Sequence, residues 1–215
     1  ATLSSPFPTS LSKSGNTYSL GIGLNGEPSG VEELTILIVD RAVFDGGGNS
    51  AATTQIKSKV ILNDKNAPII TKLLLAENNK TIDITFNEKV FGTNDANSAI
   101  DSSVFNLSIS GGLAKLSQVK PLSISAKDST TYTITLPLTG TPDGSEIVTI
   151  SIETQSVFDA SGSEAAKTQA INKVTLNDLS APLIVSTKLD SDNSKVTVLF
   201  NVTVFGTPKN TGDLE

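Results

Sequence analysis

The chain contains 215 residues with a formal net charge of −6, a balance that argues against nucleic acid or an anionic membrane surface as its partner. Cys, His, Met and Trp are all absent, which excludes disulfides, thiolate nucleophiles, imidazole bases and His/Cys zinc sites. No apolar run approaches the roughly 18 residues of a membrane-spanning helix, and the first residues lack a signal-peptide pattern, as expected of a mature or excised segment.

Short runs of alternating apolar and polar residues predict β-strands, and these runs are densest between residues 66 and 179. In "TIDITFN", Ile82, Ile84 and Phe86 fall on one face of an extended chain. Gly-Gly, Asp-Ser and Pro-Asp-Gly sequences separate the runs as turn formers. In chain order the main predicted strands are 68–75, 81–87, 104–110, 131–136, 146–152 and 172–177.

Two local details of this strand pattern stay open from the sequence. In "EIVTISI" either Ile147 or Val148 begins the inward-facing series. The segment "NDANSAIDSSVF" predicts one helical turn, with Asp95 or Ser98 as its N-cap.

Internal repetition is the strongest signal in the chain. "VFDGGGNSAATTQ" begins at Val43, and "VFDASGSEAAKTQ" begins 114 residues later at Val157. "ITFNEKVFGT" at Ile84 returns as "VLFNVTVFGT" at Val198, with the same displacement. The register slips by one residue near the N-terminus, where "PTSLSKSGNTY" is one residue shorter than "PLSISAKDSTTY". The period therefore predicts a repeating domain of ordinary size.

The repeated stretch "VILNDKNAPII" at 60–70 and "VTLNDLSAPLI" at 174–184 predicts where one domain passes into the next. Proline has no N–H for a central strand ladder, and it pushes the preceding residue to extended geometry. A polar Asn-Asp run before Ala-Pro therefore reads as a linker. The predicted units are the C-terminal part of a first repeat, one complete repeat and the N-terminal part of a following repeat, at 1–65, 66–179 and 180–215.

Seven or eight short strands within one period predict an all-β fold. The specific architecture expected is a series of tandem immunoglobulin-like antiparallel β-sandwiches with a 114-residue repeat. The absence of Cys and Trp removes the disulfide and tryptophan of antibody domains and leaves the sandwich architecture possible.

Over its whole length the chain resembles the bacterial Ig-like tandem repeats of large surface adhesins and extracellular stalk proteins. The residues that carry the resemblance are "LNDxxAPxI", "ITFNEKVF", "GTPDGSE" and "VFDASGS…AA". The resemblance implies a secreted, cell-surface location and a role as an extender that holds a terminal binding domain away from the cell. It also implies calcium at some junctions. Among the positions that differ between copies, two bear on a possible ligand site: Glu88 is replaced by Val202, and Asn49 by Ser163.

The acidic residues do not form an evident catalytic pair. A glycosidase needs two carboxyl groups that face each other across a cleft. The pairs Asp83 with Glu88 and Asp143 with Glu146 instead lie close in sequence, on strands or turns, which favours structural or solvated roles. No serine or threonine has a base suggested by the pattern, so the sequence predicts that the protein is not an enzyme.

Four aspartates are the candidate metal ligands. Asp45 and Asp159 follow Val-Phe and precede Gly-containing turns, and Asp64 and Asp178 lie in the two Asn-Asp junctions. Calcium takes six to eight oxygen ligands from such groups. The alternative for each aspartate is an Asx turn, in which its carboxylate accepts a nearby backbone N–H.

The sequence therefore predicts a non-enzymatic structural repeat, either an extender or stalk or a filament-forming segment of an adhesin-type protein. The expected partners are neighbouring repeats or identical chains arranged head to tail, in which the strands near one end of a molecule complete those of the next. The alternative is a ligand-binding Ig-like module for a glycan or another cell-surface partner. The scarcity of aromatic residues, with two Tyr, eight Phe and no Trp, favours the structural role.

Overall fold

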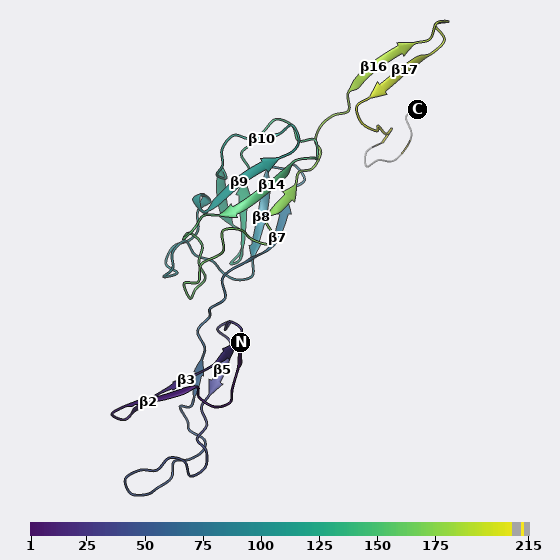
Figure 1. Cartoon of the computed structure of the whole chain (residues 1–215). Helices are drawn as coiled ribbons and strands as arrows, with labels where there is room; N and C mark the ends of the chain where they lie inside the picture. Colours follow the sequence, from purple (N-terminus) through teal and green to yellow (C-terminus); the bar gives the residue numbers. More distant parts are fainter. Residues whose placement is uncertain (208–211, 213–215) are drawn as a thin grey trace.

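The computed structural model describes residues 1–207 and 212, and its regular elements are almost all β-strands (Figure 1). The exception within this part of the chain is the single-turn 3₁₀ helix η1 (Ser102–Val104). Every pairing between its named strands is antiparallel. The prediction of an all-β antiparallel fold is confirmed. No helix of the described residues is both long enough and apolar enough to cross a bilayer.

Two antiparallel sheets lie against each other in the middle of the chain (Figure 1). The first has the order β11-β12-β8-β7, formed by Ser123–Ala126, Thr131–Thr135, Thr81–Phe86 and Ile70–Leu75. The second has the order β15-β14-β9, formed by Lys173–Thr175, Ile147–Ile152 and Phe105–Ser110. A short ladder joins β10 (Lys115–Leu116) to β13 (Leu138–Thr139). This arrangement is consistent with a β-sandwich.

The side chains between the two sheets form one hydrophobic core, because the long strands bury every second residue. β8 buries Ile82, Ile84 and Phe86, as the alternation predicted. In β14 the inward series begins at Val148, while Ile147 is 38% exposed. We call residues 70–176 the central unit. Its buried core residues are Ile70, Ile82, Ile84, Phe86, Val90, Ile100, Val104, Phe105, Leu107, Tyr132, Ile134, Leu136, Val148, Ile150, Ile152, Val157, Ala165 and Leu176.

The helical turn expected between residues 94 and 105 is present as η1, but its cap is Asp101. The Asp101 Oδ1 atom accepts a hydrogen bond from the Ser103 amide at 2.7 Å. The prediction of Asp95 or Ser98 as the cap was wrong. Because Val104 packs into the core, the turn forms at residues 102–104. Asp101 directly precedes this turn and therefore caps it.

Residues 1–65, the N-terminal segment, form three short ladders that leave many apolar side chains exposed. The first ladder pairs β1 (Thr2–Leu3) with β4 (Leu24–Asn25). The second pairs β2 (Ser10–Ser14) with β3 (Thr17–Gly21). The third pairs β5 (Glu33–Thr35) with β6 (Lys59–Ile61).

Beyond the central unit, β16 (Ile184–Leu189) and β17 (Val196–Phe200) form a two-stranded ladder, which we call the C-terminal hairpin. Its register begins with Ile184 opposite Phe200 and shifts before Ser186. The β7–β8 pair has the same irregularity, with Ile70 opposite Phe86 and a shift directly afterwards. In Figure 1 the central strands stand between the N-terminal strands and this hairpin.

Candidate metal centre at the first junction

Three carboxylates from three separate segments meet where the first junction enters the central unit. The ligand oxygens of Asp64, Glu88 and Asp159 all lie within 4.8 Å of one another. Asp159 is buried, and the other two residues are half-buried. The cluster thus joins the linker at the end of the N-terminal segment to two loops of the central unit.

A short backbone bridge brings two of these residues together. Phe91 N donates to Phe158 O at 2.8 Å, and Phe158 N donates to Phe91 O at 2.9 Å. Glu88 lies just beyond the end of β8, and Asp159 directly follows Phe158. The bridge therefore fixes both acids at the same end of the core.

The Asp159 carboxylate also organises its own turn. Its Oδ1 atom accepts hydrogen bonds from the amides of Ser161 at 2.8 Å and Ser163 at 2.7 Å. The Ser161 hydroxyl lies 2.9 Å from both carboxylate oxygens. This is the Asx-turn chemistry that the sequence offered as the alternative to a metal ligand, and the same side chain faces Asp64 and Glu88.

Asp64 reaches the cluster from a linker that is held to the N-terminal segment. Its Oδ1 atom accepts a hydrogen bond from the Asn66 amide at 2.9 Å. The neighbouring Lys65 N donates to Pro28 O at 2.8 Å. A cation bound by Asp64 together with Glu88 and Asp159 would therefore join consecutive parts of the chain.

The electrostatics of the cluster are unfavourable for three bare anions. The pKa of Glu88 is raised above its ordinary value, first by desolvation and then by the negative charges of Asp159 and Asp64, while a hydrogen bond from Asn87 acts in the opposite direction. A proton or a cation relieves this repulsion. Carboxylate oxygens are hard ligands suited to calcium, which fills its remaining positions with carbonyl oxygens and water.

The raised pKa gives a prediction for the cation-free protein. The folded state holds the Glu88 proton more tightly than the unfolded state, so this residue makes stability fall as pH rises from the ordinary carboxyl range through the raised pKa. In chelator at pH 7, Glu88→Gln should raise the unfolding midpoint, and the gain should shrink as the pH falls into the ordinary carboxyl range, where Glu88 is protonated in both states. Thermal melts across this range test it, and a gain independent of pH would contradict it.

The structure brings together two of the four predicted metal ligands, Asp64 and Asp159. Asp45 and Asp178 join no group of three potential ligands among residues 1–207. Asp45 accepts the amides of Gly47 and Asn49, and the Asn49 side-chain hydrogen bond is the main cause of its lowered pKa. Asp178 accepts the Ser180 amide at 2.8 Å.

Sequence reasoning did not select Glu88 as a ligand, although it is the third member of the cluster. The sequence feature that could have pointed to Glu88 is its position just after a predicted strand that also bears Asp83. Its replacement by Val202 in the next copy shows only that a site using this side chain cannot recur there.

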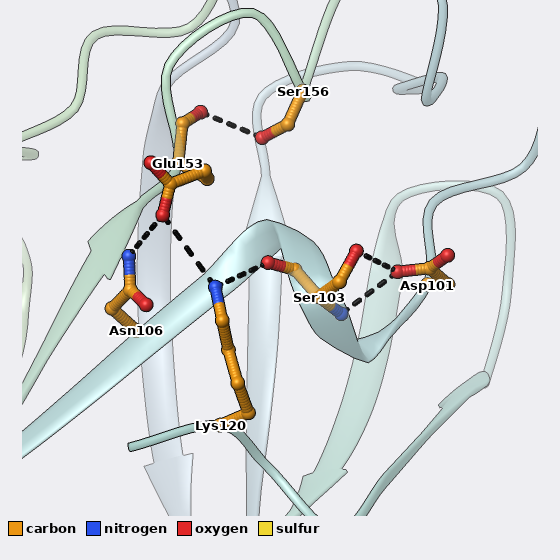
Figure 2. A network of polar contacts seen from close by, with 6 residues as sticks. All are labelled: Asp101, Ser103, Asn106, Lys120, Glu153 and Ser156. Atoms are coloured by element: carbon orange, nitrogen blue, oxygen red, sulfur yellow. Dashed lines mark hydrogen bonds and ion pairs between the residues drawn. The ribbon is translucent and has the colours of Figure 1, made fainter.

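A second polar cluster lies at the start of β9, beside the end of β14, and Figure 2 shows its members: Asp101, Ser103, Asn106, Lys120, Glu153 and Ser156. Lys120 Nζ donates to Ser103 O at 2.6 Å and lies 3.5 Å from Glu153 Oε2. Asn106 Nδ2 donates to the same Glu153 oxygen at 2.6 Å, and this bond is the largest cause of the lowered pKa of Glu153.

These contacts tie the loop before β11 to η1 and to the end of β14 (Figure 2). The Ser103 hydroxyl donates to Asp101 Oδ1 at 2.5 Å, so it takes part in the cap of the turn. The Ser156 hydroxyl donates to the Glu153 carbonyl oxygen at 2.6 Å. These hydrogen bonds hold the loop, η1 and the end of β14 together, and we assign them a structural role.

Comparison of the chain with protein-family models, curated proteins and solved structures gave no match.

Proposed function

We propose that the chain is a non-enzymatic structural repeat, an extender, stalk or filament-forming segment of a bacterial cell-surface or extracellular adhesin-type protein. It is composed of immunoglobulin-like units with a 114-residue period, divided at 1–65, 66–179 and 180–215. Its function is to hold consecutive units in line.

The strand order of the central unit supports the immunoglobulin-like assignment. In immunoglobulin domains of the constant type, strands A, B, E and D form one sheet and C, F and G the other. Assigning A to G to β7, β8, β9, β11, β12, β14 and β15 reproduces both orders.

The observation that carries the structural role is that the two junctions are fixed by matching contacts. At the first junction Lys65 N donates to Pro28 O at 2.8 Å, and at the second Leu179 N donates to Pro142 O at 2.9 Å. The Pro28 and Pro142 carbonyls lie just before turns that contain Gly30 and Gly144. The linker residues Asp64 and Asp178 pass next to these two glycines. A linker bonded to the preceding unit transmits orientation better than a free one, which suits an array under tension.

Force spectroscopy on a polyprotein of several copies of the chain tests this proposal. Each central unit should rupture in one step and unfold to an extended length of about 350–385 Å, from roughly 3.3–3.6 Å per residue, so the molecule lengthens by this amount less the span of the folded unit. Gradual extension without discrete steps would contradict a structural role under load.

The ligand-binding alternative is tested separately on a glycan array with the 215-residue chain. On the outer face of the first sheet, hydroxyls that could meet a sugar are already engaged. The Thr133 hydroxyl donates to Asp83 at 2.6 Å, and the hydroxyls of Ser123 and Thr135 lie 2.8 Å apart. Specific binding of one glycan class would favour the alternative.

We also propose that Asp64, Glu88 and Asp159 bind calcium and stiffen the first junction. The support is the convergence of three carboxylates from the linker and two loops. Saturating calcium should raise the unfolding midpoint by roughly 5–10 °C at about 100-fold excess over the dissociation constant.

The second junction offers a matched control for this calcium effect. Asp64→Asn should abolish most of the stabilisation by calcium, whereas Asp178→Asn should preserve it. At the second junction Val202 stands at the position that Glu88 occupies at the first, so Asp178 has no such carboxylate beside it. Melts of both variants in calcium and in chelator make the comparison. Identical midpoints for the unmodified chain in the two buffers would remove the proposal.

A further inference from the structure

The first and last strands of the central unit, β7 and β15, lie next to each other along one side of the unit (Figure 1). β7 is the edge strand of one sheet and β15 the edge strand of the other, and no backbone ladder joins them in the described part of the chain. Backbone groups at such an edge need partners from elsewhere. We call the contact between β7 and β15, together with the residues that close its two ends, the seam.

The side-chain amide of Gln169 closes one end of the seam. Its Oε1 atom accepts the Ile70 amide at 2.9 Å, and its Nε2 atom donates to Ala166 O at 2.7 Å. Gln169 is 5% exposed, so both bonds are shielded from water. They tie the first residue of β7 to the loop that leads into β15.

The opposite end of the seam is closed by Asn79, in the turn that follows β7. Asn79 Nδ2 donates to Asn177 O at 2.8 Å, and Asn177 N donates to Asn79 Oδ1 at 2.9 Å. The Asn177 side chain donates in turn to Ala76 O and Glu77 O, each at 3.2 Å. Asn79 is 1% exposed and has φ +59°, a left-handed conformation that asparagine tolerates better than most residues. The segment that leaves β15 is thereby tied to the turn that leaves β7.

The order of these two contacts shows that β7 and β15 run parallel. Gln169, before β15, meets the start of β7, and Asn177, after β15, meets the turn after β7. The chain enters the unit at Ile70 and leaves it beyond Asn177. Tension along the chain therefore pulls the two strands in opposite directions along their common axis. Both ends of the seam are then loaded together instead of being peeled apart one after the other.

The amides of the seam recur in the neighbouring copies of the repeat. Gln55, Asn63 and Asn193 stand 114 residues from the three amide residues of the seam. Asn193 has φ +61°, close to the value at Asn79. Glu88 of the metal centre, in contrast, does not recur. The seam thus belongs to the repeated part of the sequence, as expected of a contact that each unit needs.

We propose that the seam is the contact that bears the load when the central unit is stretched, and that the amides of Gln169, Asn79 and Asn177 supply its resistance. This inference rests on the proposed structural role and names the contact through which the unit resists tension. Amide groups are neutral donors and acceptors, so the seam holds without a bound cation.

Stretching the full chain at constant force in chelator, with handles at the two chain ends, tests the proposal, because forced unfolding is governed by the unfolding rate. Asn79→Gly removes one amide and keeps the positive φ accessible. Gln169→Met removes the other and keeps an unbranched side chain of similar length. Each variant loses at least two hydrogen bonds, so each should unfold about tenfold faster or more.

A second pulling geometry separates load bearing from a general effect on stability. The chain has no cysteine, so Ser129→Cys and Thr154→Cys, both at exposed positions, can place the handles inside the unit. Tension then runs through residues 129–154, and both ends of the seam lie outside this stretch. In this geometry Asn79→Gly and Gln169→Met should raise the unfolding rate by less than about threefold.

Asn106→Ala is the matched control, because it removes a side-chain amide away from the seam. Asn106 Nδ2 donates to Glu153 Oε2 at 2.6 Å, between β9 and the end of β14. With handles at the chain ends this variant should unfold within about twofold of the unmodified rate, because its bond stays intact until the seam ruptures. Urea transitions followed by circular dichroism establish that each variant folds. If one seam variant does not fold, the other decides the test.

Unchanged rates in the seam variants, or equal increases in the two pulling geometries, would overturn the inference. With both variants folded, an effect of only one of them would show that the two ends break in turn, which overturns the shared load. The structural role is judged separately, by whether the unmodified unit ruptures in one step. Stepwise rupture with unchanged variant rates would therefore refute the seam alone, whereas gradual extension of the unmodified chain would refute the structural role.

Discussion

Replacing Glu146 with alanine is expected to lower the free energy of unfolding of the central unit by about 3–5 kcal/mol. The Glu146 side chain is fully buried. Its Oε1 atom accepts the amides of Leu113 and Ala114, each at 2.9 Å, and Oε2 accepts those of Asp143 at 3.0 Å and Gly144 at 3.2 Å. Truncation leaves four donors without their acceptor, and each unsatisfied buried group costs roughly 1–3 kcal/mol before water enters.

Urea unfolding followed by circular dichroism measures this loss, because the central unit contains the buried core that unfolds cooperatively. Glu146→Gln should also destabilise, since its amide group would face N–H donors on one side. Glu32→Ala is the matched control: Glu32 accepts the Ser29 amide at 2.9 Å in the N-terminal segment. That variant should leave the transition unchanged, and a loss below about 1 kcal/mol for Glu146→Ala would contradict the argument.

Glu146 also explains a glycine that the sequence pattern marked only as a turn former. Gly112 has φ +52°, and a Cβ added there would lie 2.1 Å from the Glu146 carboxyl carbon. The buried acid thus occupies space that any other residue at position 112 would need. The sequence placed Glu146 near Asp143 in a turn, but it gave no sign of the amides at 113 and 114, which tertiary folding brings to it.

The strands were predictable because a face that packs on a core imposes a period of two. In β8 and β9 the inward residues Ile84, Phe86 and Leu107 follow this period, and all three are buried. The choice between Ile147 and Val148 needed the pairing of β14 with β9, which places Val148 opposite Ile109. Local alternation identifies a strand, while its register depends on the neighbouring strand.

The candidate metal centre was only partly predictable for a related reason. Repetition shows that Asp45 and Asp159 occupy equivalent positions, but a repeated motif does not say which residues of adjoining units face each other. The contact runs from Asp64 in the linker to Glu88 and Asp159 in the unit that follows it. Asp178 would need the corresponding turn of a later unit, and Val202 already replaces the middle carboxylate.

The second large effect concerns Phe86, which is 2% exposed in the central unit. Its ring meets that of Tyr132 edge to face, with centroids 6.3 Å apart and an interplanar angle of 82°. Phe86→Ala removes this contact and leaves a cavity between the sheets. We expect the free energy of unfolding of the central unit to fall by about 3–5 kcal/mol, the usual cost of truncating a buried phenylalanine.

Phe200→Ala is the matched variant, because Phe200 lies 114 residues later and ends β17 as Phe86 ends β8. Phe200 belongs to the C-terminal hairpin, outside the buried core of residues 70–176. The urea transition should therefore stay within about 0.5 kcal/mol of the unmodified chain. The two substitutions remove the same atoms. The difference between their losses in free energy of unfolding therefore measures how much burial in a completed core stabilises the phenylalanine ring. Equal losses of stability in both variants would show that the hairpin already packs within its own chain.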